Sequence, residues 1–245
     1  MRGKPLIRFS LNVPQENKTI AVIIPALNEE GSLGDVLRDI PNGNPLRVIV
    51  ADNGSTDRTA EVARAAGAEV VSAPRRGYGS ACLAGIQALK NESVVVFIDA
   101  DGSSDPNEIP RLIEPIEQGA ADLVIGSRRL GRVEPGAMSL PARVGNRLAP
   151  FLIRVIWGYR YTDLGPFRAI RADALRRLNM RDTDYGWTVE MQIKAVRHGL
   201  KIMEVPATWR CRRAGESKIS RTLRGVLGAS FKIIWTILRH AISRS

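Results

Sequence analysis

Two acidic residues, one position apart, follow the most apolar run of the sequence. Asp99-Ala100-Asp101 comes directly after VVVFI and is followed by Gly102. Carboxylates at the end of a buried strand repel each other and lose hydration, unless a cation joins them. One or two carboxylates together with phosphate oxygens commonly hold a hard divalent ion, and Mg²⁺ or Mn²⁺ suits such an all-oxygen site. The alternative is that one Asp caps the next helix and the other is solvated.

A second acidic segment follows the apolar run Arg47–Ala51. Asp52 ends this run, and Asn53-Gly54-Ser55-Thr56-Asp57 comes next. A carboxylate in this place can accept a hydrogen bond from a base N–H, and a glycine lets a ligand approach the backbone. An Asx turn and a helix cap would explain Ser55 to Asp57 but would leave Asp52 unexplained.

The elements that position these residues alternate between short apolar runs and helical patterns. The runs are apolar on both faces, as buried parallel strands are. Strands are predicted at Ile20–Pro25, Arg47–Ala51, Glu69–Ser72, Val94–Asp99 and Asp122–Gly126. Helices are predicted between them, at Ser32–Ile40, Thr56–Ala66, Gly79–Leu89 and Pro106–Gln118. This alternation predicts a doubly wound α/β sheet whose ligand lies beyond the carboxyl ends of the strands.

The alternation stops after Gly126. The Gly/Arg-rich stretch that follows predicts a loop over Arg129–Pro141, which we expect to act as a lid. Further helices are predicted at Ala142–Trp157, Ala172–Leu178 and Thr188–His198. The last segment, Ser217–Ile242, predicts a basic amphipathic helix that lies either in a membrane interface or on the protein's own core. Its predicted apolar stripe consists of Leu223, Leu227, Phe231, Ile234, Leu238 and Ala241, widened by Val226, Ile237 and Ile242.

Composition narrows the class of protein. The 245 residues, 44% apolar and 25% charged, suit one large folded domain. Cys82 and Cys211 have no metal-ligand spacing, and no run is long and apolar enough for a transmembrane helix. The net charge is +11, and the segment from Lys201 to Ser245 contains 10 basic and 2 acidic residues. A basic balance of this kind attracts nucleic acid, anionic lipid or a phosphorylated substrate. The N-terminus has no apolar signal-peptide region.

Five segments together carry a family resemblance. IIPALNEE, VADNGSTD, RRGYGSACLAGI, FIDADG and VIGSRR, spread over about Ile20 to Arg129, resemble the nucleotide-sugar-binding half of family 2 glycosyltransferases of the GT-A fold. The resemblance implies a GT-A-type, Rossmann-like, mostly parallel sheet flanked by helices, with an acceptor-side extension and the C-terminal amphipathic helix. Asn53 departs from the family, which usually has a second Asp there, but its amide keeps an acceptor.

The resemblance also implies roles for individual residues. Pro25, Ala26, Glu29 and Asp52 would face the nucleoside, and Gly77 would lie near the base or ribose. Asp99 and Asp101 would meet ribose, diphosphate and a Mg²⁺ or Mn²⁺ ion, which offsets the charge that develops on the leaving group. Family 2 enzymes invert the configuration of the transferred sugar. Neither the sugar nor the base, uracil or guanine, follows from these residues.

The second half resembles the acceptor side of the polyprenyl-phosphate branch, the dolichyl-phosphate mannose or glucose synthases. The matching segments are TDLGPFR, at 162–168, and YGWTVEM, at 185–191. Gly165-Pro166-Phe167-Arg168 departs from the usual motif, which is closer to SGFR. Guanidinium groups grip phosphate with two hydrogen bonds. The candidates for such contacts with the acceptor are Arg128, Arg143, Arg168, Arg210, Arg212 and Arg213.

The acceptor determines whether a base is needed. A phosphate acceptor is already anionic, whereas a hydroxyl acceptor needs a carboxylate within hydrogen-bond reach. Glu190 and Asp163 are the candidates for this base, and with Asp101 they make up the predicted catalytic residues. A helix cap is the alternative role of Glu190.

These observations predict one catalytic domain over 1–217, with a donor half at 18–129 and an acceptor half at 130–217, and an amphipathic helix at 218–245. The expected activity is transfer of a sugar from a UDP- or GDP-sugar to a polyprenyl phosphate by an inverting, metal-dependent hexosyltransferase. The enzyme is expected in the cytoplasm, peripherally at the inner face of the membrane. A hydroxyl acceptor on a glycan, lipid or small metabolite is the first alternative. A nucleotide- or nucleic-acid-binding protein without transferase activity is the second, although the sequence contains no recognised nucleic-acid-binding motif.

Overall fold

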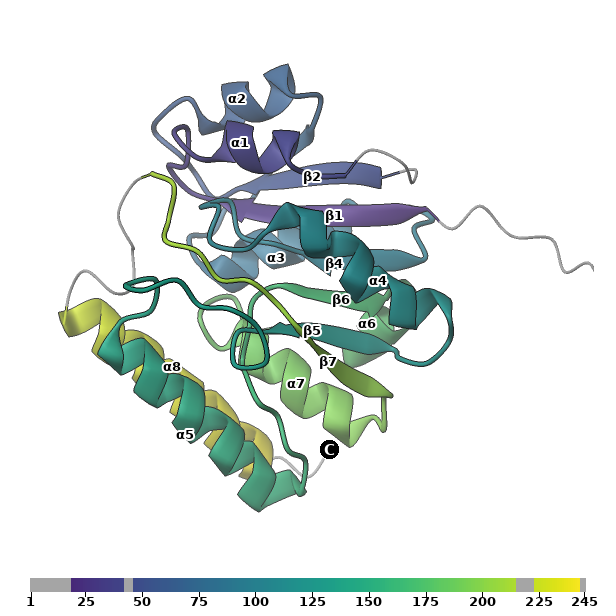
Figure 1. Ribbon diagram of the computed structural model, residues 1–245, viewed down its shortest axis with the longest axis vertical. Coiled ribbons are helices and arrows are strands. Elements are labelled where there is room, and N and C mark those ends of the chain that lie inside the picture. Colours follow the sequence, from purple (N-terminus) through teal and green to yellow (C-terminus); the bar gives the residue numbers. More distant parts are fainter. Residues whose placement is uncertain (1–18, 42–45, 215–222, 243–245) are drawn as a thin grey trace, which may run out of the picture.

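One mixed sheet forms the centre of the protein (Figure 1). The computed structural model describes residues 19–41, 46–214 and 223–242. In these residues seven strands pair in the order β3-β2-β1-β4-β6-β5-β7. The strands are β1 (Ile20–Ala26), β2 (Leu46–Asp52), β3 (Glu69–Ser72), β4 (Val94–Phe97), β5 (Leu123–Ser127), β6 (Arg168–Arg171) and β7 (Ile202–Pro206).

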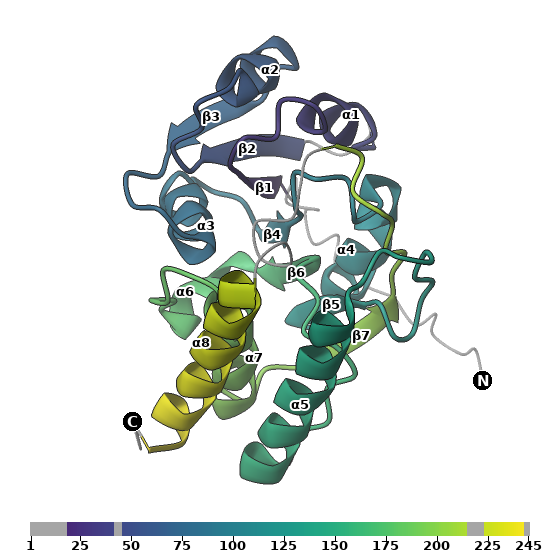
Figure 2. The same cartoon turned by 90° about the vertical axis from the view of Figure 1, so that its left-hand side faces the viewer.

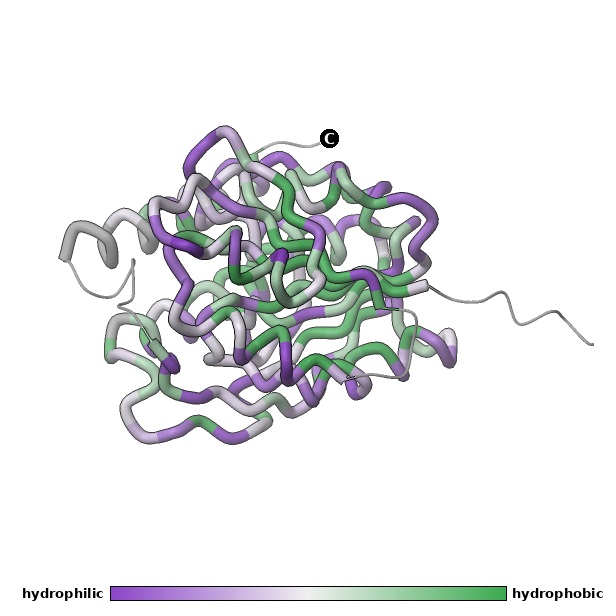
Figure 3. Tube along the Cα trace, turned by 90° about the horizontal axis from the view of Figure 1, so that it is seen from above, coloured by the Kyte–Doolittle hydropathy of each residue, from purple (hydrophilic) through white to green (hydrophobic). Residues whose placement is uncertain are grey.

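Helices cover both faces of the sheet, because successive side chains of a strand point to opposite sides. Ile20, Val22 and Ile24 of β1 pack toward one group of helices, whereas Ala21 and Ile23 pack toward the other. The first group is α1 (Leu33–Arg38), α2 (Thr59–Ala65) and α4 (Ile109–Glu117), which follows a short 3₁₀ turn, η1 (Pro106–Glu108). The second is α3 (Tyr78–Gln87), α5 (Leu140–Trp157), α6 (Ala172–Leu178), α7 (Trp187–Arg197) and α8 (Leu223–Ile242). Figure 3 shows the hydrophobic residues gathered along the central strands.

The mostly parallel α/β architecture is confirmed, and all five predicted strands form within two residues of their expected bounds. β1 pairs in parallel with both β2 and β4, and β5 pairs in parallel with β7. Two strands were not predicted. β6 lies antiparallel between β4 and β5, so β4 and β5 are not neighbours. Because β6 belongs to the predicted acceptor half and pairs with β4 of the donor half, one sheet runs through both halves.

The predicted helices also form; Ala172–Leu178 has the predicted bounds, and the others differ from the prediction at their ends. Asp105 caps η1, with its carboxylate accepting a hydrogen bond from the Asn107 N–H at 3.1 Å. α5 begins at Leu140, with the Ser139 hydroxyl as its cap. The predicted start of the last helix at Ser217, and the predicted domain boundary at 217/218, lie outside the described residues.

α8 lies beside α5 on the outer side of the protein (Figures 1 and 2). Among the α8 residues whose side chains the structure describes, Thr236 and Ile237 are buried, and Ile233 is partly buried against the core. Of the predicted apolar stripe, Phe231 and Leu238 are exposed, whereas Ile237, one of the residues that widen it, is buried. The helix docks on the protein and still presents apolar side chains outward.

Candidate active site

The carboxyl ends of β1 and β2 bring the first predicted donor residues together. Ala26 and Asp52 are partners in the parallel register, and Pro25 precedes Ala26 in β1. The Asn53 N–H donates to the Ala26 carbonyl oxygen at 2.9 Å. Asp52 is half-buried, and its Oδ1 accepts a hydrogen bond from the Ser55 N–H at 3.0 Å. Pro25, Ala26 and Asp52 therefore line one edge of the sheet, as the sequence predicted.

Asn53 organises the loop that carries Gly77. Its amide nitrogen donates to the Arg75 carbonyl at 2.7 Å, and its amide oxygen accepts from the Gly77 N–H at 2.8 Å. Gly77 has φ 135°, and a side chain there would collide with the Thr183 carbonyl. The Ser80 N–H, in the first turn of α3, donates to that same carbonyl at 2.9 Å. Gly77 is thus held beside Asn53, next to the edge of the sheet at which Asp52 lies.

Asp99 and Asp101 come after β4 at the same edge of the sheet. The Tyr78 hydroxyl donates to Asp99 Oδ1 at 3.2 Å. The pKa of Asp99 is raised to about 7, chiefly by burial and also by the charge of Asp101, although the Tyr78 hydrogen bond and the charges of Arg212 and Arg128 oppose the rise. The two carboxylates are therefore close enough to resist simultaneous ionisation.

The carboxylate oxygens of Asp99 and Asp101 are ligands that suit a divalent cation. Within the described residues, no group of three or more His, Cys, Asp or Glu side chains is placed to hold a metal ion. A cation held by Asp99 and Asp101 would need further oxygen ligands, such as those of a diphosphate. The raised pKa of Asp99 means that a cation would relieve repulsion between these carboxylates.

Glu29 also reaches this edge. It is buried, 7% exposed, and its Oε2 accepts a hydrogen bond from the Ser32 hydroxyl at 3.0 Å. Its Oε1 lies 3.3 Å from Nη1 of Arg212, whose Nη2 lies 2.8 Å from Asp101 Oδ2. Arg212 was predicted to contact the acceptor, but the structure places it among the donor residues.

The two neighbouring arginines point elsewhere. Arg210 pairs with Asp105, and Arg213 pairs with Asp39 at 2.5 Å and with Asp35 at 3.5 Å. The three arginines of this segment therefore do not converge on one phosphate in the described arrangement.

A cationic pocket does form between α5 and the loop that was predicted to be a lid. Its volume is about 330 Å³, and it is lined by Arg128, Arg129, Val133, Glu134, Pro135, Met138, Arg143, Asn146 and Arg147. The structure thus brings together Arg128 and Arg143 of the predicted acceptor set. Arg129 and Arg147 were missed, although the spacing of Arg143 and Arg147, four residues apart on one helix, was a usable signal.

Asp163 fixes the position of Arg128, which lines this pocket. It is fully buried, and its carboxylate forms a two-pronged ion pair with Arg128. Burial alone would raise the pKa of Asp163, but the hydrogen bonds and charge of Arg128 outweigh it and lower the pKa. A carboxylate of low pKa with both oxygens engaged is a weak base near neutral pH. Its predicted role as a base stays a prediction, and its contacts are those of a residue that positions Arg128.

Glu190 and Arg168 are buried among backbone groups. The Glu190 carboxylate accepts from the N–H groups of Arg181 and Asp182 and lies 2.7 Å from Lys194 Nζ. Arg168 donates to the carbonyls of Thr188 and Gly165 and is 0% exposed. The geometry therefore corrects the expectation that Arg168 faces an acceptor phosphate. For Glu190 it gives a structural role, and its role as a base stays a prediction.

The loop predicted to be a lid is attached to the rest of the site. The Trp209 N–H donates to the Arg132 carbonyl at 2.7 Å, and the Glu134 N–H donates to the Trp209 carbonyl at 2.9 Å. The guanidinium carbon of Arg128 lies 4.9 Å from the centre of the Trp209 ring. Whether the loop opens and closes with substrate remains a prediction.

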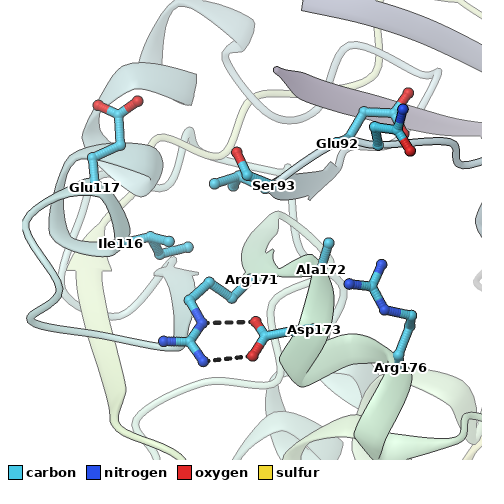
Figure 4. A pocket seen from close by; sticks show the side chains of 10 residues that line it. Glu92, Ser93, Ile116, Glu117, Arg171, Ala172, Asp173 and Arg176 are labelled. Carbon is cyan, nitrogen blue, oxygen red and sulfur yellow. Dashed lines mark hydrogen bonds and ion pairs between the residues drawn. The ribbon is translucent and has the colours of Figure 1, made fainter. Parts of the chain in front are cut away.

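A second pocket, of about 340 Å³, lies at the opposite edge of the sheet, where β4 begins and β6 ends (Figure 4). Arg171 and Asp173 in its wall pair through two hydrogen bonds, of 2.8 and 2.7 Å. Glu92, also in the wall, pairs with Arg47 at 2.7 Å. Arg171, Asp173 and Glu92 are thus engaged in ion pairs, and none of the predicted site residues lines this pocket.

The comparisons with known proteins agree with this arrangement. Residues 21–178 match Glycosyl transferase family 2. An uncharacterised glycosyltransferase of Mycobacterium tuberculosis is 40% identical over 208 residues, which are 84% of this chain and 92% of the relative. An undecaprenyl-phosphate mannosyltransferase of Micrococcus luteus is 34% identical over 84% of this chain and 89% of its own.

Among solved structures, the glucosyl-3-phosphoglycerate synthase of Mycobacterium tuberculosis is similar to this chain. Its complex with Mn²⁺, UDP-glucose and phosphoglyceric acid superimposes with a TM-score of 0.72 and 27% identity, over 91% of this chain and 80% of that one.

Proposed function

Because the chain belongs to glycosyl transferase family 2, we propose that it transfers a sugar from a UDP- or GDP-sugar to a polyprenyl phosphate. The donor would bind at the carboxyl edge of β1, β2 and β4, with its nucleoside against Pro25, Ala26, Glu29 and Asp52. Gly77 would lie beside the base or ribose. Asp99 and Asp101 would hold a Mg²⁺ or Mn²⁺ ion, which offsets the negative charge that develops on the leaving nucleoside diphosphate.

The reaction needs few residues beyond those that position its substrates. An oxygen of the acceptor phosphate attacks the anomeric carbon, the bond from that carbon to the diphosphate oxygen breaks, and the configuration at the carbon inverts. A phosphate is anionic at neutral pH, so no side chain has to remove a proton. The guanidinium groups would orient the acceptor and reduce its repulsion from the diphosphate.

One observation carries the choice of acceptor: α5 contributes residues both to the cationic pocket and to an exposed apolar surface. Arg143 and Arg147 of α5 line the pocket, while Val144 is 62% and Phe151 57% exposed on the same helix. The neighbouring α8 exposes Trp235, at 53%, and Ile242, at 81%. The apolar face of α5 and α8 consists of Leu140, Val144, Leu148, Phe151, Val155, Phe231, Trp235, Leu238 and Ile242. An acceptor with a phosphate head and a long hydrocarbon chain matches this combination.

The same face would attach the enzyme peripherally to a membrane. Neither α5 nor α8 contains Asp or Glu, and the exposed arginines Arg143, Arg147, Arg154 and Arg239 would favour anionic lipid. No helix in the described part of the chain is long and apolar enough to cross a membrane. We place the site at the cytoplasmic face, where nucleotide sugars are available.

A second candidate acceptor is a small phosphorylated molecule that is glycosylated on a hydroxyl. The similarity to glucosyl-3-phosphoglycerate synthase, solved with phosphoglyceric acid, favours it. The arginine pocket would then hold the acceptor's anionic groups, and Asp163 or Glu190 would have to act as the base.

The acceptor assignment is tested with Arg143→Ala and Arg147→Ala, against Arg176→Ala in the other pocket as a matched control. Transfer to a polyprenyl phosphate in detergent is measured over a range of acceptor concentrations. Because each pocket variant loses a charged hydrogen bond to phosphate, we expect its KM for the lipid to be roughly tenfold higher. The KM for the donor should be unchanged. Unchanged acceptor kinetics in both pocket variants would contradict the assignment.

A further inference from the structure

The segment Ala207–Arg213, which we call the strap, crosses the donor edge of the site. The Arg210 N–H donates to the Ser103 carbonyl at 2.7 Å, and the Arg213 N–H donates to the Asp101 carbonyl at 3.1 Å. Backbone hydrogen bonds therefore fix the strap on both sides of Arg212. Only the side chain of Arg212 is left to move.

That side chain lies between two acidic residues of the donor site. Its Nη2 is 2.8 Å from Asp101 Oδ2, and its Nη1 is 3.3 Å from Glu29 Oε1. Asp101 and Glu29 are only 8% and 7% exposed at their side chains, whereas Arg212 is 28% exposed. The two buried carboxylates thus pair with a guanidinium that is itself partly exposed to solvent.

Both oxygens of Asp101 are occupied in this arrangement. Oδ1 accepts a hydrogen bond from the Ser103 N–H at 2.9 Å, and Oδ2 faces Arg212. A divalent cation takes oxygen ligands and repels a guanidinium. A cation that binds Asp101 through Oδ2 must therefore replace Arg212 there.

We propose that Arg212 is an internal counter-ion of the donor site, which neutralises Asp101 and Glu29 until a divalent cation binds and displaces it. This inference rests on the proposed function, because that reaction is what places the cation at Asp101. It makes Arg212 a positioning residue of the donor half rather than an acceptor contact. The displaced guanidinium stays beside the site, because the strap is fixed on either side of it.

The test is the affinity for Mn²⁺ alone, without nucleotide, measured from the free Mn²⁺ signal in electron paramagnetic resonance. Arg212→Met removes the competitor. Arg213→Met removes the same charge one residue further along, where it pairs with Asp35 and Asp39. We expect Arg212→Met to bind Mn²⁺ roughly two- to fivefold more tightly than the wild type, the range of one partly exposed ion pair. Arg213→Met is expected to match the wild type.

Two further variants complete the design. Arg212→Lys keeps the charge and is expected to stay close to the wild type, and adding Asp101→Asn to Arg212→Met is expected to abolish the gain. Equal Mn²⁺ affinity in Arg212→Met and the wild type, an equal gain in Arg213→Met, or no saturable binding in any variant would overturn the proposal. Lipid-dependent sugar transfer by the wild type is assayed separately, so the transferase function can stand where the counter-ion role fails.

Discussion

Arg128 and Asp163 form a two-pronged ion pair beside the cationic pocket. Nε of Arg128 donates to Asp163 Oδ2 at 2.8 Å, and Nη2 donates to Oδ1 at 2.6 Å. The Arg128 N–H also donates to Oδ2, at 2.7 Å. Asp163 therefore fixes the direction of this guanidinium, whose charge is also close enough to Asp99 to lower the pKa of that carboxyl. Through Arg128, the cationic pocket and the sheet edge at Asp99 are electrostatically linked.

Asp163→Asn is expected to impair acceptor binding rather than chemistry. The substitution keeps the shape of the side chain but loses the charge that holds Arg128, so the KM for the acceptor should rise roughly tenfold with kcat little changed. Steady-state kinetics with varied acceptor measure both constants, and Asp173→Asn, in an exposed ion pair with Arg171, is the control. A fall in kcat of roughly 10²–10⁴, at unchanged KM, would instead identify Asp163 as a general base.

Metal binding should depend on pH through Asp99. The pKa of this carboxyl is raised to about 7, so below pH 7 a proton competes with the cation for the carboxylate. Affinity for Mn²⁺ should therefore fall about tenfold for each pH unit below 7 and level off above it. Titrations between pH 5.5 and 8.5 measure this, with Asp99→Asn as a variant that lacks the titrating group. An affinity of the wild type that is flat across this range would refute the account of Asp99.

Asn53 should not tolerate the aspartate that is usual in the family. An aspartate cannot donate to the Arg75 carbonyl, and its charge would face that oxygen at the position now 2.7 Å away. Asn53→Asp is therefore expected to lower the free energy of unfolding by about 1–3 kcal/mol and to raise the KM for the donor. Urea denaturation checks the first effect, with the exposed Asn91→Asp as control. Unchanged stability would show that the loop Arg75–Gly77 does not depend on this amide.

The apolar face of α5 and α8 should bind lipid. Phe151→Asp and Trp235→Asp each place a charge on this face. Each also removes an aromatic side chain whose burial in lipid would stabilise membrane binding. Each is expected to weaken sedimentation with vesicles of phosphatidylglycerol and phosphatidylcholine by roughly tenfold. Met203→Asp, at an exposed residue of β7, is the control. Vesicle binding that is weak in the wild type, or equal in all variants, would argue against a membrane face.

Much of the donor site was predictable because its residues follow apolar runs, and the carboxyl ends of parallel strands meet at one edge. Asp52 and Asp99 are placed in this way, whereas the expectation for Gly77 came from the family resemblance. β6 and β7 escaped prediction because β6 is a four-residue strand with an arginine at each end, and β7 contains Glu204. Arg168 and Glu204 make no apolar pattern, although Arg168 is fully buried against backbone carbonyls.

The roles of individual charged residues were harder to predict, because their partners are distant in the sequence. Glu190 accepts from backbone groups of the preceding loop, and Arg212 pairs with Glu29, 183 positions away. The sequence could not separate Arg212 from Arg213, since only the path of the strap points one toward Asp101 and the other toward Asp39.

We propose that a nucleotide sugar and a lipid phosphate meet in this site. The most direct measurement is nucleoside-diphosphate release from a panel of UDP- and GDP-sugars with Mn²⁺ or Mg²⁺, with and without a polyprenyl phosphate in detergent, followed by extraction into organic solvent. We expect nucleoside-diphosphate release that depends on the lipid, with labelled sugar in the organic phase. Release that ignores the lipid, with the label remaining in water, would contradict it and move the acceptor to a soluble hydroxyl compound.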